Sequence, residues 1–236
     1  MLLGLILLLV APPAWAETLT LFAPCGPSTP ADQAIENCTT MILSGPKMPA
    51  ILVAGYFNRG LAYARKGLDD LAIADFTQTI ALTHNSAGAH FNRALAYERK
   101  GLPDLAIDDY TQAIAIQPDF AEPRLNRGVD YGQKGLLDQA VADFTQVIAL
   151  KPDIAEAYND RAFARHMQGH DAQGLADAEK AAALAPNNGD FIETRAEIYE
   201  KLGRRDAAVA DYRAALKINP AMPLASAGLA RMGVGP

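Results

Sequence analysis

Two histidines stand at a spacing that metal sites use. His166 and His170 are four residues apart, so on one regular helix both imidazoles would face the same side and could share a zinc ion. Gly169 lies between them, however, and a glycine at such a position often ends a helix. No third ligand is evident nearby in the sequence. We therefore predict no metal site and no cofactor.

Nucleophilic catalysis has equally little support. None of the serines after residue 16 has a glycine two positions away on both sides, as a nucleophile elbow requires. The chain has neither a glycine-rich loop that could bind phosphate nor a Cys/His zinc motif. No histidine stands near Cys25 or Cys38 to activate a thiol. The sequence predicts no catalytic residue, and we expect a protein that is not an enzyme.

The first sixteen residues have the layout of a secretory signal. Residues 2–10 are almost all Leu, Ile and Val, and Ala14 and Ala16 provide the small side chains of a cleavage site. No Lys or Arg precedes this apolar run, and the run is shorter than the roughly 20 residues of a spanning helix. An uncleaved anchor is the alternative. We predict a signal peptide over 1–16, export to the bacterial periplasm, and no membrane span after cleavage.

Export bears on the two cysteines. Cys25 and Cys38 both lie near the expected mature N-terminus, and a short stretch of chain separates them. In an oxidising compartment such a pair favours a disulfide, which would stabilise the fold by about 3 kcal/mol. Two unpaired thiols are the alternative. We predict the disulfide.

One unit, repeated five times, makes up the body of the chain. A glycine returns at a constant interval, and the segments that follow, such as 71–76 and 105–110, are alike. Each unit is predicted to form two helices, the first ending at the glycine and the second at a proline on the same period. Asp119 with Glu122 has the spacing of a capping box that would start a first helix. The recurring glycines are Gly67, Gly101, Gly135, Gly169 and Gly203.

Two charged positions recur together in all five units. An arginine stands in each first helix, and an aspartate follows it at the same offset every time. Their joint recurrence predicts a structural ion pair between helices, whereas independent solvated charges would not explain it. The pairs are Arg59 and Asp75, Arg93 and Asp109, Arg127 and Asp143, Arg161 and Asp177, and Arg195 and Asp211.

The period, the small residues where helices meet, the aromatic residue and the closing proline resemble the tetratricopeptide repeat family over 53–222. The resemblance implies an all-α fold, a right-handed α-solenoid of helix–turn–helix repeats with period 34. An N-terminal cap with the Cys pair and a lone helix would cover 17–52, and a C-terminal capping helix and tail would cover 223–236. The repeats are expected at 53–86, 87–120, 121–154, 155–188 and 189–222.

In this family the first helices line a concave groove that holds peptides or partner helices. The resemblance places here a row of apolar side chains beside Asn58, Asn92 and Asn126, whose amides could hold a peptide backbone. Arg65 and Arg99 would make one end basic, while Glu193 and its neighbours would make the fifth unit acidic. The predicted groove residues are Phe57, Asn58, Leu61, Phe91, Asn92, Leu95, Leu125, Asn126, Val129 and Phe163.

The net charge of −6 disfavours a nucleic acid as partner. We therefore predict a non-catalytic adaptor of the cell envelope that binds a protein or peptide partner in the groove. A structural module that self-assembles through the faces or ends of the array is the alternative. The sequence identifies neither the partner nor the oligomeric state.

Overall fold

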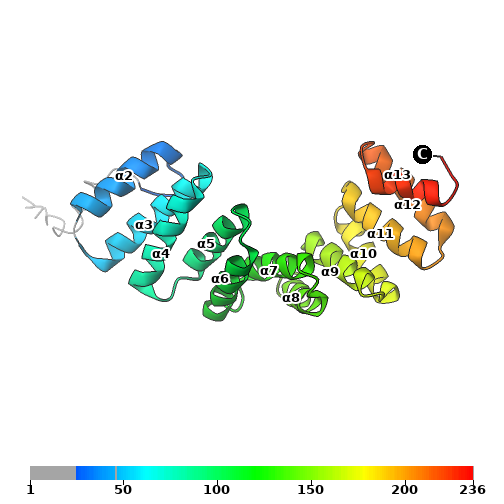
Figure 1. Ribbon diagram of the computed structural model, residues 1–236, viewed down its shortest axis with the longest axis horizontal. Helices are drawn as coiled ribbons and strands as arrows, with labels where there is room; N and C mark the ends of the chain where they lie inside the picture. Colours follow the sequence, from blue (N-terminus) through cyan, green and yellow to red (C-terminus); the bar gives the residue numbers. More distant parts are fainter. Residues whose placement is uncertain (1–24, 46, 236) are drawn as a thin grey trace, which may run out of the picture. The chain divides into compact units, whose positions relative to one another are not determined.

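The computed structural model describes residues 25–45 and 47–235, so the predicted signal over 1–16 lies outside the described residues. All regular secondary structure in the described part of the chain is helical. The chain divides into two compact units, residues 1–102 and 103–236. Each unit is described by itself (Figure 1).

The first unit contains four of the helices described. Each packs against the next one along the chain, so the lone helix before the repeats covers the first helix of repeat one. The bounds are α2 (Ala31–Ser44), α3 (Pro49–Arg65), α4 (Asp69–Thr83) and α5 (Ala87–Arg99).

The second unit continues the same pattern with eight helices. Consecutive helices again pack on each other, from α6 to α13. The predicted all-α solenoid of helix pairs is therefore confirmed within each unit. The bounds are α6 (Pro103–Ile116), α7 (Ala121–Gln133), α8 (Leu137–Leu150), α9 (Ala155–Met167), α10 (Asp171–Leu184), α11 (Gly189–Lys201), α12 (Arg205–Ile218) and α13 (Pro223–Arg231).

The recurring glycines end the first helices by adopting a left-handed backbone. Gly67 has φ +69° and Gly135 has φ +74°, and the other three lie close to these values. In this conformation the amide of the next residue, Leu68, reaches back to the carbonyl of Tyr63 at 3.0 Å. A side chain would strain the backbone here, which is why glycine returns at each turn.

Small residues let the paired helices approach closely. A Cβ added at Gly60 would lie 2.8 Å from the ring of Phe76, and one at Gly128 would lie 2.7 Å from the ring of Phe144. The rings of Phe76 and Phe144 on these second helices therefore pack directly on the backbone of the first helix of their repeat.

The predicted capping box before α7 is wrong. The N-cap residue of α7 is Phe120, which has no side-chain cap, so Asp119 lies one residue too early. Glu122 instead accepts a hydrogen bond from Lys151 Nζ at 2.6 Å. Side-chain caps occur at other helices, where Ser86 begins α5 and Asn188 begins α11.

Four of the predicted Arg–Asp pairs have the same two-pronged geometry. Arginine Nε donates to Oδ2 and Nη2 donates to Oδ1 at 2.7–2.9 Å, and the aspartates are only 4–9% exposed. Parallel charge-assisted hydrogen bonds of this kind fix the angle between the two helices of a repeat. Arg93 and Asp109 lie in different units, and their pairing stays a prediction. The four pairs join Arg59 to Asp75, Arg127 to Asp143, Arg161 to Asp177, and Arg195 to Asp211.

Two of these arginines also contact the preceding repeat, through threonines that the sequence interpretation missed. Arg127 Nη1 donates to Thr111 Oγ1 on α6 at 2.9 Å, and Arg161 Nη1 donates to Thr145 Oγ1 on α8 at 3.1 Å. One guanidinium thus joins three helices. The threonines recur with the repeat, at Thr77, Thr111 and Thr145, so the period itself was a signal for them.

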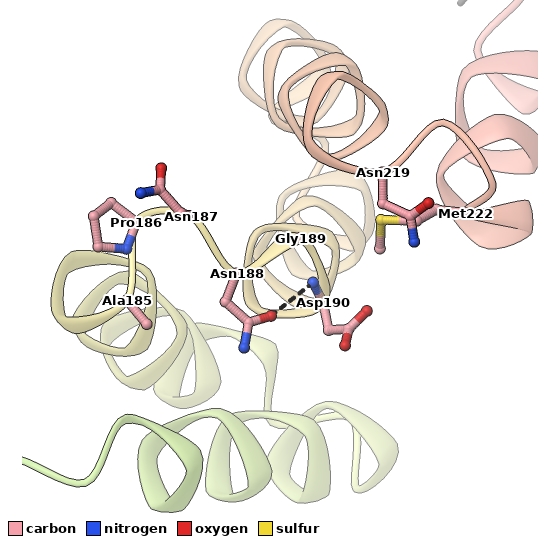
Figure 2. A pocket seen from close by; sticks show the side chains of 8 residues that line it. All are labelled: Ala185, Pro186, Asn187, Asn188, Gly189, Asp190, Asn219 and Met222. Atoms are coloured by element: carbon pink, nitrogen blue, oxygen red, sulfur yellow. Dashed lines mark hydrogen bonds between the residues drawn. The ribbon is translucent and has the colours of Figure 1, made fainter.

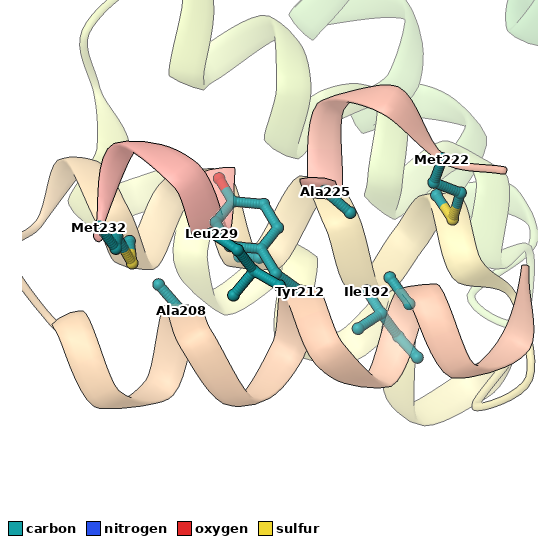
Figure 3. Packing of buried hydrophobic residues seen from close by; sticks show 9 residues of the cluster. Ile192, Ala208, Tyr212, Met222, Ala225, Leu229 and Met232 are labelled. Atoms are coloured by element: carbon teal, nitrogen blue, oxygen red, sulfur yellow. The ribbon is translucent and has the colours of Figure 1, made fainter. Parts of the chain in front are cut away.

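The C-terminal helix α13 covers the last repeat. Tyr212 of α12 is fully buried and packs with Ala225 and Leu229 of α13, as Figure 3 shows. Gly228 permits this contact, because a Cβ there would lie 2.4 Å from the tyrosine ring. The final repeat is thereby closed by an apolar layer, as the end of a solenoid requires.

Candidate functional site

We call the inner face of a first helix the side that carries the predicted groove residues. Six of these residues lie on α3 and α5 in the first unit, and four lie on α7 and α9 in the second. Those of the first unit are partly buried, whereas Val129 and Phe163 of the second unit are exposed. The two inner faces therefore differ in access to solvent.

The inner face of α3 is occupied by the chain itself. Asn58 Nδ2 donates to the carbonyl of Cys25 at 2.7 Å. Arg65 donates through Nη2 to the carbonyl of Thr29 at 3.0 Å and through Nη1 to the carbonyl of Pro27. The segment 25–29 thus binds to α3 through its backbone.

A disulfide ties this segment to the cap helix. Cys25 and Cys38 are bonded, with their Cα atoms 5.1 Å apart, and the Cys38 side chain is fully buried on α2. The bond holds the segment near α3 because α2 packs against α3.

The three predicted ladder asparagines make three different bonds. Asn58 holds the N-terminal segment, as described above. Asn92 Nδ2 donates to the Gly88 carbonyl of its own helix at 2.7 Å, and Asn126 Nδ2 donates to the Tyr110 hydroxyl at 3.2 Å. Each of the three side-chain amides therefore donates a hydrogen bond within the chain, and binding of a ligand by these asparagines stays a prediction.

The inner face of the second unit is hollow between α7 and α9. A cavity of about 440 Å³ opens there, with largely apolar walls that include Val129, Phe163 and Met167. These side chains are 36%, 47% and 58% exposed. Phe144 of α8 also lines the cavity.

The cavity owes its space to Gly132 of α7. A Cβ added to Gly132 would have no heavy atom within 4 Å. The same repeat position carries Ala64, Glu98, His166 and Glu200 in the other units. The sequence interpretation did not select Gly132, although it is the only glycine at this position of the repeat.

Asp160 of α9 is the one charged residue among those that line the cavity. Burial raises the pKa of its carboxyl group to about 6, while the Asn159 Nδ2 donor at 3.3 Å opposes that rise only in part. Within the described part of the chain, no cation lies within ion-pair distance of Asp160. The cavity thus has apolar walls and one poorly solvated acid.

A second hollow, of about 430 Å³, lies between His166 of α9 and the acidic face of α11. Arg231 forms two hydrogen bonds with Glu200, which lower the pKa of that carboxyl group. Burial raises the pKa of Glu197, which has no comparable partner among the described residues. The predicted acidic end is therefore only partly neutralised.

The basic residues expected at the other end are used within the first unit. Arg65 holds the segment 25–29, and Arg99 forms an ion pair with Asp69 at 2.6 Å. Neither guanidinium is left without a partner to meet an acidic ligand.

A third hollow, of about 490 Å³, adjoins the start of α11 (Figure 2). Asn188 Oδ1 accepts hydrogen bonds from the backbone amides of Asp190 at 3.0 Å and Phe191 at 3.4 Å. Asn219 Oδ1 likewise accepts from the amide of Ala221 at 3.0 Å. These polar groups serve the turns and helix starts around the hollow.

The histidines singled out from the sequence do not build a metal site in the part of the chain that the structure describes, where no cluster of three potential ligands occurs. His166 Nδ1 contacts the carboxylate of Asp171, and His170 precedes α10. Among the described helices, none combines the length and apolar character needed to cross a membrane.

Comparisons with known proteins point to the fold and to one family. The tetratricopeptide repeat family matches residues 87–120, 125–189 and 192–222. YrrB, described as a TPR protein with an unusual peptide-binding site, is 17% identical, with 85% of this chain and 100% of that chain covered and a TM-score of 0.73. No curated protein matches the sequence.

Two further solved structures show the same likeness. The MamA protein is 22% identical over 72% of this chain and 93% of its own, with a TM-score of 0.68. The pilF protein of Pseudomonas aeruginosa is 18% identical over 78% and 84%, with a TM-score of 0.67. At these identities the likeness concerns the fold alone. Together with the family matches, it shows that this chain contains tetratricopeptide repeats.

Proposed function

We propose that this protein is a non-catalytic adaptor of the cell envelope that binds a peptide segment or helix on the inner faces of its first helices. The observation that carries the proposal is the open apolar cavity between α7 and α9. Exposure of apolar side chains to water is unfavourable, and large exposed apolar side chains around a hollow are typical of binding sites.

Two further features support the proposal. YrrB, a structure of the same fold, is described as having a peptide-binding site. Within this chain, Asn58 and Arg65 already hold the backbone of a turn, residues 25–29, on α3 through its carbonyl groups. An inner face of this protein therefore has the chemistry to bind a peptide.

A location in the cell envelope, with the bacterial periplasm as its compartment, follows from the predicted signal over 1–16 and agrees with the Cys25–Cys38 disulfide. Disulfides persist in oxidising compartments. Fusing residues 1–16 to a reporter enzyme that is active only after export tests this part directly. A reporter that stays inactive contradicts it.

Filling the cavity tests the binding proposal. Gly132→Leu places a side chain in the open space and replaces a helical glycine, so the fold should be retained or stabilised by about 1 kcal/mol. Phage-displayed random dodecapeptides selected on the wild-type protein should lose binding to this variant. Ala176→Leu, which adds the same side chain at an exposed position of α10, is the matched control and should keep binding.

Two results would contradict peptide binding at the cavity. One is a selection that enriches no sequence above the unselected library. The other is a set of enriched peptides that bind wild type and Gly132→Leu equally well. Phe163→Ala, which removes an exposed wall of the cavity, provides a second, independent variant.

Self-assembly is the second candidate function, because exposed apolar side chains also lie on the first and last helices described, α2 and α13. Leu43 on the cap helix is 69% exposed, and Leu224 on α13 is 54% exposed. Light scattering over a range of concentrations separates the two functions. A monomer at every concentration contradicts assembly, whereas a mass that grows with concentration and falls with Leu43→Ser or Leu224→Ser supports it.

A further inference from the structure

We infer that the partner bound at this cavity is a basic peptide that places one bulky apolar side chain between α7 and α9 and a lysine or arginine side chain beside Asp160. The inference rests on the proposed function and names the chemistry of its partner. The apolar cavity indicates the bulky side chain of the partner, and the acidic residues around it that lack an ion-pair partner indicate its basic side chain.

The cavity is suited to a large side chain. Its volume of about 440 Å³ falls within the range of roughly 300–1,000 Å³ that is usual for ligand pockets. Gly132 contributes no side chain to it, and apart from Gln133 and Asp160 the side chains that line it are apolar. Met167 can adapt its flexible thioether to rings of different shape. An aromatic, leucine or methionine side chain would therefore displace water without leaving a polar group unpaired.

Asp160 of α9 requires a cation more than Asp143 of α8 and Asp177 of α10 do. Asp143 and Asp177 each accept two hydrogen bonds from an arginine of their own repeat. Asp160 receives only the neutral donor of Asn159 and has no ion-pair partner in the described part of the chain. A partly buried carboxylate loses hydration that a cationic side chain from a partner would replace.

The negative charge continues from α9 to the next first helix. Glu193 and Glu197 of α11 are partly buried, and neither has a cation within ion-pair distance among the residues described. Glu197 shares its hollow with His166, the residue before Met167 of the cavity wall. A peptide that leaves the cavity toward α11 therefore meets two acids without an ion-pair partner among the described residues, Glu193 and Glu197, beside Lys201 and the Glu200–Arg231 pair.

The basic residues of the first unit give no reason to expect an acidic partner. Arg65 and Arg99, the basic residues expected there, are both engaged within the chain. The sequence alone was compatible with a partner that is acidic at one end and basic at the other. Because these two arginines are engaged within the chain, only the acidic residues of the second unit can recognise a charged partner, and they would bind its basic residues.

The test repeats the dodecapeptide selection on wild type and on Asp160→Asn. Asparagine stands at this repeat position in three other units, so the variant is expected to fold. Wild type should enrich peptides that combine an aromatic, leucine or methionine residue with lysine or arginine. Asp160→Asn should keep the apolar enrichment and lose the basic one.

Fluorescence anisotropy with one enriched synthetic peptide gives the magnitude. Replacing its basic residue by glutamine, or Asp160 by asparagine, should weaken binding about tenfold or more, and combining both changes should add little. Asp153→Asn, at an exposed turn before α9, is the control carboxylate and should leave the affinity unchanged.

The outcomes distinguish the inference from the function on which it rests. Suppose that the enriched peptides bind wild type but not Gly132→Leu. If they lack basic residues, or bind Asp160→Asn as tightly as wild type, the inference is overturned while peptide binding at the cavity stands. A selection with no cavity-dependent peptide would overturn both.

Discussion

The inner face of α3 and the inner face between α7 and α9 are built from the same repeat, yet only the second is open. On α3 the segment 25–29 lies against Asn58 and Arg65. Between α7 and α9 a cavity remains, with Phe163 and Met167 exposed at its rim. A shared fold therefore does not give each repeat the same access to a partner.

The difference has two local causes. The first inner face adjoins a segment that the Cys25–Cys38 disulfide holds in place. The second contains Gly132, where the other repeats carry a side chain. In both regions the first helix packs against the second helix of its repeat, so the same repeat architecture can present either a covered or an open inner face.

The buried ion pairs should be equally important in both regions, and they carry the largest expected effect. Asp75→Ala in the first unit and Asp143→Ala in the second should each lower the free energy of unfolding by about 3–5 kcal/mol, because each leaves a buried guanidinium without its partner. Urea denaturation followed by circular dichroism measures the change.

Asp104→Ala is the control for these two variants, since Asp104 pairs with Lys134 at the exposed surface. It should leave the denaturation midpoint unchanged. If Asp75→Ala and Asp143→Ala differ by more than their experimental errors, the two regions do not share an equivalent frame, and the comparison must be revised.

Loss of the disulfide should affect only the covered face. The Cys25→Ser and Cys38→Ser double variant should lose about 3 kcal/mol of unfolding free energy, because the unfolded chain regains the freedom of the open loop. Exchange of the Thr29 amide, which donates to the Gly26 carbonyl, should become faster, and exchange in α7 and α9 should stay unchanged. Reduced wild type separates this effect from the burial of a serine hydroxyl at Cys38. Unchanged exchange of the Thr29 amide would show that the contacts with α3 suffice to hold the segment 25–29.

Asp160 should make the open face sensitive to pH. Because its pKa is raised from 3.8 to about 6, the folded state holds the proton more tightly than the unfolded state, so wild-type stability should fall as pH rises through this interval. Asp160→Asn removes that loss. It should be more stable than wild type by at most about 3 kcal/mol at neutral pH, and the difference should vanish below the unfolded pKa of 3.8.

Thermal unfolding of both proteins over this pH range provides the measurement. The charge of Glu156 contributes to the raised pKa of Asp160, so the loss of their repulsion in Asp160→Asn is part of the difference that is measured. Parallel stability profiles for wild type and Asp160→Asn would show that Asp160 is well solvated.

The smallest effect is expected at the asparagines. Asn58→Ala should cost about 1 kcal/mol, because it removes the hydrogen bond to the Cys25 carbonyl. Asn92→Ala should cost less, since its amide bonds only to the Gly88 carbonyl of its own helix, which is already in the helical hydrogen-bond pattern. Equal denaturation midpoints for these two variants would argue that the segment 25–29 contributes little to the covered face.

Much of the fold could be predicted because each repeat is a local structure. Gly67 and Gly135 ended helices as expected, and the small residues Gly60 and Gly128 lie where aromatic rings meet a helix backbone. The capping box at Asp119 failed because its spacing fixes a possible hydrogen bond but not the residue at which the helix begins.

The site was less predictable. Phe163 and Val129 were predicted groove residues, and they do line the cavity, but Gly132 and Asp160 had not been selected as groove residues. A missing side chain leaves no positive signal in a sequence. The partners of Arg65 likewise lie in a segment with no recurring pattern, so the use of its guanidinium within the chain could not be foreseen.

The sequence by itself determined the repeat, its helix pairs and the paired Arg and Asp positions, because interactions within and between neighbouring helices recur at fixed spacing. Only the tertiary structure decided which inner face is covered and which is hollow. That outcome depends on contacts between segments without a common period, and on the volume left between neighbouring helices, which no single residue specifies.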